Sequence, residues 1–219
     1  MSLKDQLAQR RAEWYQRVPA DRHAAILRHI EALKTETISR TILKVGDRVP
    51  AIVLDNAKGE IVDVADLLKK GPVVVAFYRG GWCPYCNLEL KALQEILPQV
   101  AAAGASLVAI SPETSDNALA TAENNGLSFE VLSDVGHKVG RAFGLVFEFS
   151  DELRSTYQGF KIDIPGRNGT PGEWFLPVAA TYVVDCGGKI VYAYTEVDYR
   201  DRADPEEILA ALNRREAST

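Results

Sequence analysis

Residues 73–86 read VVVAFYRGGWCPYC. The stretch opens with a continuous apolar run, rich in β-branched residues, from Val73 to Tyr78. Such a run is typical of a strand that is buried on both faces, as in the middle of a parallel sheet. Gly80 and Gly81 follow and allow the backbone a tight turn. The stretch therefore predicts a buried strand that ends in a turn.

A helix is predicted to follow the turn. Apolar residues recur at helical spacing after Pro84, namely Leu88, Leu90, Leu93, Ile96, Leu97 and Val100. Proline favours the first position of a helix, because its missing N–H has no partner there in any case. Cys83 then lies at about the N-cap, and Cys86 lies one turn later on the same face. We expect Pro98 to kink or split this helix, since it removes one backbone donor.

The two cysteines predict thiol chemistry. Unpaired N–H groups and the helix dipole favour negative charge at a helix N-terminus. We therefore expect a lowered pKa for the Cys83 thiol, whose thiolate is the reactive form. Cys86 lies within reach of Cys83 and can close a small disulfide ring with it. A reactive cysteine with a resolving partner is the favoured interpretation.

Three other interpretations of the cysteine pair compete with this one. The pair could be half of a zinc site, but the chain offers only Cys186 and three scattered histidines as further ligands, and a tetrahedral site is hard to assemble from them. The cysteines could be inert core residues, since free cysteine is often buried. They could form a structural disulfide, which a reducing compartment disfavours. We favour redox chemistry and expect neither a metal nor a cofactor.

Length and charge restrict the class of protein. The chain has 219 residues, enough for one good core with an appendage or for two small domains. Its formal net charge is −5 and no basic run stands out, which argues against a nucleic-acid surface. No window approaches the roughly 18 apolar residues that cross a bilayer, and the polar N-terminus lacks the apolar core of a signal peptide. We expect a cytoplasmic protein that binds neither nucleic acid nor a membrane.

Residues 1–44 are predicted to form an N-terminal helical extension. Two apolar stripes at the helical period indicate two helices. The stripes consist of Leu3, Leu7, Trp14 and Val18 and of Ile26, Leu27, Ile30 and Leu33. Pro19 separates them, and Asp21 can cap the second helix. Such helices pack either on the main domain or on a second subunit, so a homodimer is an open alternative.

Residues 45–219 are predicted to form one α/β domain. Around the central stretch we expect strands at 52–54, 61–64, 106–110 and 129–132 and helices at 65–70, 115–125 and 138–143. Strands that alternate with helices favour a parallel sheet with right-handed crossovers. A hairpin at 180–195 follows, with Cys186 as a bystander in its turn, and Asp204 and Pro205 begin a final helix.

Residues 145–178 interrupt this alternation as an excursion from the domain. Ser150 can cap a small helix at 151–158, but several glycines and prolines indicate a loop for most of the rest. Loops of this length inside compact domains are usually functional or mobile. Two interpretations are open: a lid or wall beside the cysteines, with Trp174 and Phe175 as anchors, or a surface excursion with one aromatic anchor.

Several motifs together resemble known families. The WCxxC string at 82–86 resembles the motif of thioredoxins, and the order of elements is that of the thioredoxin fold. The segments 46–50, 74–78, 108–111, 132–134 and 181–189 resemble the peroxiredoxin (alkyl hydroperoxide reductase/thiol-specific antioxidant) family. The 79–86 string, the N-terminal helices and the excursion resemble its peroxiredoxin-like branch with a CxxC active site. The resemblance implies a thioredoxin-like α/β fold with a central mixed sheet flanked by helices.

Two positions depart from the pattern of this family. Typical peroxiredoxins have a threonine three residues before the reactive cysteine and an arginine before the last hairpin, and these groups help to hold the peroxide. Here the two positions are Gly80 and Ala179. Arg79 is the obvious substitute cation, with the backbone N–H groups of Gly81 and Trp82 as donors. The alternative for Arg79 is a surface residue in a salt bridge.

The resemblance and the position of Cys83 together imply a thiol peroxidase. Cys83 would attack hydrogen peroxide or an organic hydroperoxide and become a sulfenic acid. Cys86 would condense with it to a disulfide that a thioredoxin- or glutaredoxin-type donor reduces. The expected supporting residues are Arg79, Gly80, Gly81, Trp82 and Pro84. Two alternatives stay open: a thiol–disulfide oxidoreductase of the thioredoxin type, and a redox-sensing binding module without turnover.

Overall fold

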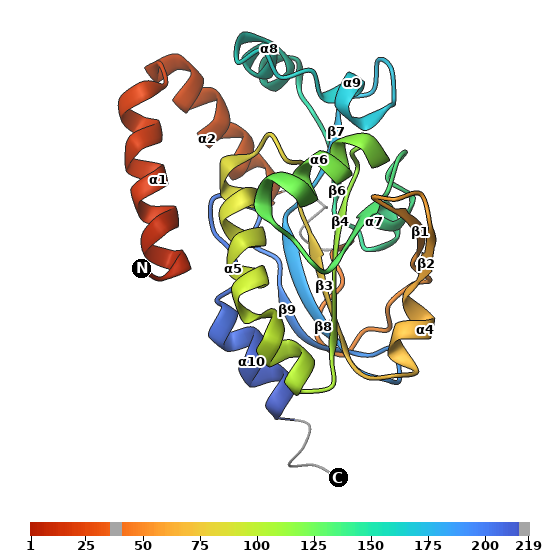
Figure 1. The fold of residues 1–219 in the computed structure, drawn as a ribbon. Helices are drawn as coiled ribbons and strands as arrows, with labels where there is room; N and C mark the ends of the chain where they lie inside the picture. Colours follow the sequence, from red (N-terminus) through yellow and green to blue (C-terminus); the bar gives the residue numbers. More distant parts are fainter. Residues whose placement is uncertain (36–40, 215–219) are drawn as a thin grey trace.

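A mixed sheet of seven strands lies at the centre of the molecule. The fold is that of a computed structural model, which describes residues 1–35 and 41–214 (Figure 1). Residues 36–40 of the predicted extension and residues 215–219 lie outside the described residues. The strand order is β2-β1-β5-β4-β3-β8-β9. The strands are β1 (Val53–Asn56), β2 (Ile61–Asp63), β3 (Val73–Phe77), β4 (Ser106–Ser111), β5 (Glu130–Ser133), β8 (Ala180–Val184) and β9 (Ile190–Tyr194). The predicted α/β class with a central mixed sheet is confirmed.

The central strand β3 is buried along its whole length, as its apolar run predicts. It pairs in parallel with β4, and β4 pairs in parallel with β5. On its other side β3 pairs antiparallel with β8. The expectation that β3 lies in the middle of a parallel sheet is therefore wrong on that side. Burial on both faces follows from the layers that cover the sheet, whatever the direction of the neighbouring strands.

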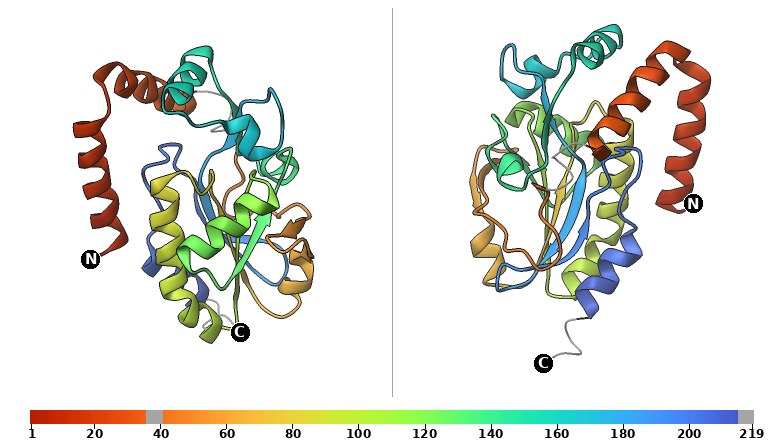
Figure 2. Two further views of the ribbon diagram at one scale, coloured as in Figure 1. Left: turned by 45° about the horizontal axis from the view of Figure 1, so that its top comes forward. Right: turned by 180° about the vertical axis from the view of Figure 1, so that it is seen from behind.

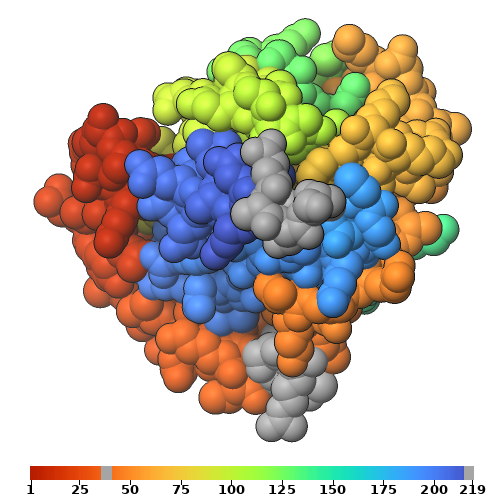
Figure 3. Space-filling view, turned by 90° about the horizontal axis from the view of Figure 1, so that it is seen from below, coloured from red at the N-terminus to blue at the C-terminus, as the bar shows by residue number. Residues whose placement is uncertain are grey.

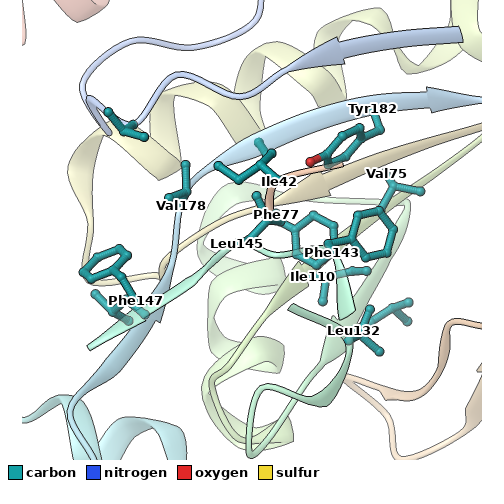
Figure 4. Close-up of a cluster of buried hydrophobic side chains, with 14 of the residues drawn as sticks. Ile42, Val75, Phe77, Ile110, Leu132, Phe143, Leu145, Phe147, Val178 and Tyr182 are labelled. Carbon is teal, nitrogen blue, oxygen red and sulfur yellow. The ribbon is translucent and has the colours of Figure 1, made fainter. Parts of the chain in front are cut away.

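Helices cover both faces of this sheet. The helices of the described residues are α1 (Leu3–Arg17), α2 (Ala20–Thr35), α4 (Val64–Leu68), α5 (Pro84–Ala102), α6 (Ser115–Asn125), α7 (Lys138–Ala142), α8 (Asp151–Gly159), α9 (Ile164–Asn168) and α10 (Pro205–Asn213). Successive side chains of β3 point to opposite faces. Val74 and Ala76 pack with α5 and α10, whereas Val75 and Phe77 pack on the other face with Phe143 (Figure 4). Among the described residues, no helix combines the length and the apolar character that a membrane span requires.

Helix α5 begins as predicted, with Cys83 at the N-cap and Pro84 at the first helical position. It runs without interruption through Pro98, so the prediction of a split is wrong. Ile96 and Val100, on either side of Pro98, are buried in the core between the helix and the sheet. Their packing offsets the backbone hydrogen bond that a proline removes inside a helix.

The N-terminal helices pack on the rest of their own chain. Leu3 and Leu7 of α1 belong to a buried cluster with residues of α5, and Figure 3 shows α1 beside the last part of the chain. Helix α2 lies against α8, where Arg28 forms an ion pair with Glu152 (Figure 2). The extension thus covers its own chain. A domain boundary between residues 44 and 45 and a homodimer stay predictions.

The start of α2 differs from the prediction. The helix begins at Ala20, and the N–H groups of Arg22 and His23 donate to the carbonyl oxygen of Pro19. Asp21 therefore lies in the first turn and not at the N-cap. Its negative charge is still favourable there, because the helix dipole is positive at this end.

The segment 145–178 is more regular than predicted. β6 (Val146–Glu148) and β7 (Phe175–Pro177) pair antiparallel, and α8 and α9 lie between them in the chain. Ser150 caps α8 as predicted, and Asp163 caps α9. Outside α8 the predicted loop is present at residues 160–163 and 169–174. The prediction missed β6, α9 and β7, because strands of three residues and a helix of five residues are too short to leave a periodic pattern.

Candidate active site

The two neighbouring cysteines lie where β3 turns into α5. Cys83 is 1% exposed, Cys86 is fully buried, and neither is in a disulfide. The Cys86 thiol donates a hydrogen bond to the sulfur of Cys83. The backbone N–H of Arg79 donates to Cys86 Sγ over 3.5 Å. The structure therefore brings together the pair that the CxxC spacing predicts, in its reduced state.

The surroundings make one thiol acidic and the other not. Burial opposes ionisation of Cys83, but the hydrogen bond from Cys86 and the charges of Arg79 and Arg202 outweigh it and lower the pKa from 9.0 to about 6. Burial and the neighbouring Cys83 raise the pKa of Cys86 well above its ordinary value of 9.0. At neutral pH Cys83 is therefore the thiolate and Cys86 the thiol, as a nucleophile and its partner require.

The Arg79 side chain lies in a cage of aromatic rings. It is 2% exposed, so the alternative of a surface salt bridge is wrong. The guanidinium carbon lies 3.9 Å from the ring centre of Tyr199 and 5.1 Å from that of Trp82, and the guanidinium donates to the Tyr157 hydroxyl. Its Nε and Nη1 atoms are buried without a hydrogen-bond partner. Buried donors without an acceptor are costly, so these two atoms are available to an acceptor that enters the site.

The geometry around Gly80 explains why no threonine stands there. Gly80 has a φ of +142°, a conformation that side chains rarely adopt. A Cβ atom at this position would lie 2.3 Å from Nε1 of Trp82 and 2.9 Å from Cδ of Glu113. The indole of Trp82 thus occupies the space that the family's threonine would need.

The buried carboxylate of Glu113, which follows β4, holds the turn before Cys83. It accepts hydrogen bonds of 2.7 Å from the N–H of Gly81 and from Nε of Arg167. The N–H of Gly81 is therefore directed at Glu113 and not at the thiolate, contrary to the expectation. Sequence reasoning missed Glu113 and Arg167, because both are distant from the cysteines along the chain and α9 was expected to be a loop.

A second arginine reaches the cysteines from the segment before α10. Arg202 donates from Nη2 to Cys86 Sγ over 3.3 Å and from Nε to Glu89 over 2.6 Å. Both Arg202 and Glu89 are buried, and sequence reasoning missed both. A signal in the sequence could have identified Glu89, since it is a charged residue one turn after Cys86 on the apolar side of α5. No such signal identifies Arg202, because only the fold brings it to the cysteines.

A cavity of about 240 Å³ lies beside Cys83. Its walls are almost entirely apolar and aromatic, and four separate parts of the chain form them. The active-site turn contributes Arg79 and Trp82, and the N-terminal helices contribute Trp14. The 145–178 segment contributes Phe160, and the segment before α10 contributes Tyr199. Of the two interpretations of the 145–178 segment, the wall beside the cysteines is therefore the one observed, although the expected anchors Trp174 and Phe175 do not line the cavity.

The third cysteine lies apart from this pair. β8 pairs with β3 so that Val184 lies beside Val73, at the start of β3. Cys186 follows Val184, whereas Cys83 lies beyond the other end of β3, so the sheet separates them. Within the described part of the chain, no group of three His, Cys, Asp or Glu residues is placed to hold a metal ion.

Comparisons of the sequence identify relatives with thiol chemistry. The AhpC/TSA family model matches residues 45–193. A protein of Mycobacterium tuberculosis named as a peroxiredoxin is 31% identical over 157 residues, which cover 72% of this chain and 88% of that protein. Peroxiredoxin Bcp of Escherichia coli is 32% identical over 130 residues, 57% of this chain and 82% of Bcp. The thiol-disulfide oxidoreductase ResA of Bacillus thuringiensis is 29% identical over 104 residues, 47% of this chain and 59% of ResA.

Solved structures of peroxiredoxins have the same fold. Peroxidoxin BcpB of Mycobacterium tuberculosis superposes with a TM-score of 0.62 at 23% identity, over 78% of this chain and 97% of BcpB. Peroxiredoxin Q of Xanthomonas campestris superposes with a TM-score of 0.57 at 20% identity, over 74% of this chain and 90% of the other. The predicted thioredoxin-like fold is confirmed by this likeness. Because the family model matches well over half of its length, the chain belongs to the AhpC/TSA family.

Proposed function

We propose that the chain is a thiol-dependent peroxidase in which Cys83 reduces hydrogen peroxide or an organic hydroperoxide. The observation that carries this proposal is an acidic Cys83 thiol, with a pKa of about 6, in the same cavity as the unpartnered donors of Arg79. An acidic thiol supplies a nucleophile at neutral pH. Buried donors supply a binding site for an oxygen acceptor. Membership of the AhpC/TSA family supports the same chemistry.

The first step is an attack by the Cys83 thiolate on the terminal oxygen of the peroxide. A sulfur–oxygen bond forms, the oxygen–oxygen bond breaks, and Cys83 is oxidised to a sulfenic acid. The departing oxygen takes up a proton and leaves as water or as an alcohol. Negative charge develops on that oxygen during the step, and the guanidinium of Arg79 is the group that stabilises it.

Cys86 is the proposed resolving thiol. It already donates a hydrogen bond to Cys83, so the two sulfurs need to move little to form a bond. Condensation of the sulfenic acid with the Cys86 thiol gives a disulfide and one water. A thioredoxin- or glutaredoxin-type donor then reduces the disulfide by thiol exchange.

The test of the proposed function is the rate at which the reduced protein loses thiols to one equivalent of hydrogen peroxide. We expect a rate constant orders of magnitude above that of a free thiol of ordinary pKa, because the thiolate is both preformed and paired with cationic donors. Thiol titration and tryptophan fluorescence follow the reaction independently. A rate no faster than that of a free thiol would contradict the peroxidase function.

The Cys86→Ser variant is expected to lose turnover with thioredoxin, while one equivalent of peroxide still oxidises Cys83. Serine keeps a hydrogen-bond donor beside Cys83 but cannot form a disulfide, so excess peroxide carries the sulfenic acid on to the sulfinic acid. Steady-state peroxide consumption and the mass of the Cys83 peptide measure the two effects. Cys186→Ser is the matched control and should turn over normally. Normal turnover in Cys86→Ser would remove Cys86 as the resolving thiol.

The cavity predicts that an apolar hydroperoxide reacts faster than hydrogen peroxide. A water molecule occupies about 30 Å³ in the liquid, so the cavity of about 240 Å³ far exceeds what hydrogen peroxide fills. An apolar group that enters between Trp14 and Phe160 leaves water and gains free energy. We expect the rate constant for cumene hydroperoxide to exceed that for hydrogen peroxide by about tenfold or more.

A pair of variants checks the role of the cavity. Val18→Trp places a large side chain in the cavity wall and should reduce the preference for cumene hydroperoxide. Leu27→Trp, on the exposed side of α2, is the matched control and should keep the preference. Equal rate constants for the two peroxides in the unmodified protein would show that the cavity does not select the substrate.

A thiol–disulfide oxidoreductase of the thioredoxin type is the second candidate. It is favoured by the identity with ResA and by Gly80 and Ala179, which stand where typical peroxiredoxins hold the peroxide. The same two cysteines would then exchange disulfides with a protein substrate. Reduction of insulin much faster than peroxide would support this candidate, and failure to reduce any model disulfide would exclude it.

A further inference from the structure

A buried carboxyl group lies one helical turn beyond the cysteine pair. Glu89 is 2% exposed on α5. Its Oε2 accepts the 2.6 Å hydrogen bond from Nε of Arg202, and its Oε1 accepts a 3.2 Å hydrogen bond from the hydroxyl of Thr181 on β8. A carboxylate that deep in the core is costly unless it is paired and hydrogen-bonded, and both of its oxygens have a partner here.

Arg202 links this carboxyl to the resolving cysteine. One edge of its guanidinium bonds Glu89, while Nη2 donates to Cys86 Sγ over 3.3 Å. Nη1 donates to the backbone carbonyl oxygens of Tyr199 and Asp201. The guanidinium is thus held in one place between two groups that can each carry a negative charge.

A single positive charge cannot neutralise both groups. Burial and, to a smaller extent, the negative charge of Cys86 raise the pKa of Glu89 to about 7, although Arg202 and Thr181 favour its ionised form. Burial opposes the charge of Arg202 too, but Glu89 and the cysteines raise its pKa, so it stays cationic. When Glu89 is ionised, the guanidinium of Arg202 pairs with its carboxylate. When Glu89 is neutral, the same guanidinium can stabilise a negative charge on the sulfur of Cys86.

We propose that Glu89 is a positioning residue that controls the ionisation of Cys86 through Arg202. When Glu89 is protonated, Arg202 stabilises the thiolate of Cys86, which is the form that attacks. This role in resolution rests on the proposed peroxidase function. The thiolate attacks the sulfur of the Cys83 sulfenic acid, a sulfur–sulfur bond forms, and the sulfur–oxygen bond breaks. The hydroxide that leaves takes up the proton that Cys86 gave up, so the products are a disulfide and one water.

Other charged and titratable groups lie near this arrangement. Besides Arg202, Cys86 interacts with Arg79, Cys83, Tyr78 and Tyr157, and Arg202 interacts with Tyr194. Burial raises the pKa of each of these tyrosines, so all of them stay neutral near pH 7. Arg79 remains cationic throughout, and it is the same in every variant below.

The test is a titration of Cys86 in protein that carries Cys83→Ser and Cys186→Ser. Thiolate absorbance is measured against a variant without any cysteine, which subtracts the tyrosines. Glu89→Gln should lower the midpoint of Cys86 by about one pH unit, a tenfold shift in the equilibrium, because the amide keeps the shape of the carboxyl but does not compete for the charge of Arg202. Glu95→Gln, on the exposed side of the same helix, is the matched control and should not move the midpoint. An unchanged or raised midpoint in Glu89→Gln overturns the proposal.

A second variant distinguishes the charge effect from a change in packing. Thr181→Val removes a hydrogen bond from Glu89 and changes the packing around it. Glu89, with a pKa of about 7, stays ionised over the higher pH range in which Cys86 titrates, so the midpoint of Cys86 should stay in place. In the Glu89→Gln background, Thr181→Val should likewise have no effect. A fall of the midpoint in Thr181→Val would assign the shift in Glu89→Gln to packing and overturn the proposal.

The titration separates this proposal from the proposed function. It uses neither peroxide nor reductant, so its failure leaves the peroxidase activity of Cys83 untouched. Conversely, a protein that does not react with peroxide can still show the shift of the Cys86 midpoint. In that case the control of Cys86 ionisation by Glu89 would stand, and its role in forming the disulfide would not.

Discussion

Cys83→Ser is expected to abolish the fast reaction with peroxide and to lower the second-order rate constant by on the order of 10³-fold or more, the scale on which loss of a nucleophile acts in other enzymes. The hydroxyl of serine stays protonated at neutral pH, whereas the Cys83 thiol has a pKa of about 6. Serine is also a preferred N-cap residue, so α5 should start as before. The remaining cysteines are a thiol of raised pKa and one at the far end of the sheet, so neither replaces Cys83.

The pH dependence of the reaction checks the same assignment without a mutation. The thiolate is the reactive form, so the rate should be almost constant above pH 7 and should fall about tenfold per unit well below the pKa of about 6. Stopped-flow fluorescence with hydrogen peroxide measures this profile. Thermal unfolding of Cys83→Ser is the control for folding. A variant that unfolds normally and still reacts rapidly would show that another thiol is the nucleophile.

The central stretch could be predicted because its signals are local. A buried strand, a glycine turn and a proline at the first helical position each depend on a few neighbouring residues, and together they place Cys83 at the N-cap. Helix α6 is a second case, since its bounds at residues 115–125 agree with the prediction. The lowered pKa of Cys83 agrees in direction with the prediction from the helix N-terminus, but its causes are the hydrogen bond from Cys86 and the charges of Arg79 and Arg202.

The rest of the site depends on contacts between distant parts of the chain. Tyr157 and Tyr199 hold Arg79 from segments about 80 and 120 residues away, and no local pattern announces such contacts. Glu113 is likewise placed by the sheet. Glu89 is the exception, because a charged residue on the buried side of a predicted helix requires a buried partner. The requirement predicts that a cation lies beside Glu89, but it does not identify that cation as Arg202.

Arg79→Met is expected to lower the rate constant for oxidation of Cys83 by about 10²-fold. The charge of Arg79 is one of the two arginine charges that lower the pKa of Cys83, so its loss raises that pKa and leaves less thiolate at pH 7. The departing oxygen also loses the buried donors Nε and Nη1. Methionine fills irregular apolar space, and it should pack among the rings of Tyr199 and Trp82. Since two unpartnered donors are removed, the thermal unfolding midpoint should not fall.

The two effects of Arg79→Met separate with pH, because only one of them concerns ionisation. Above the raised pKa of the variant the thiolate fraction recovers, and the deficit that remains measures the lost stabilisation of the departing oxygen. Arg141→Met is the matched control, since Arg141 is an exposed arginine whose guanidinium carbon lies 4.6 Å from the ring centre of Phe175. A deficit that disappears at high pH would assign Arg79 to the acidity of Cys83 alone. Unchanged rates at every pH would mean that Arg202 supplies the positive charge of the site and that the aromatic cage holds Arg79 for another purpose.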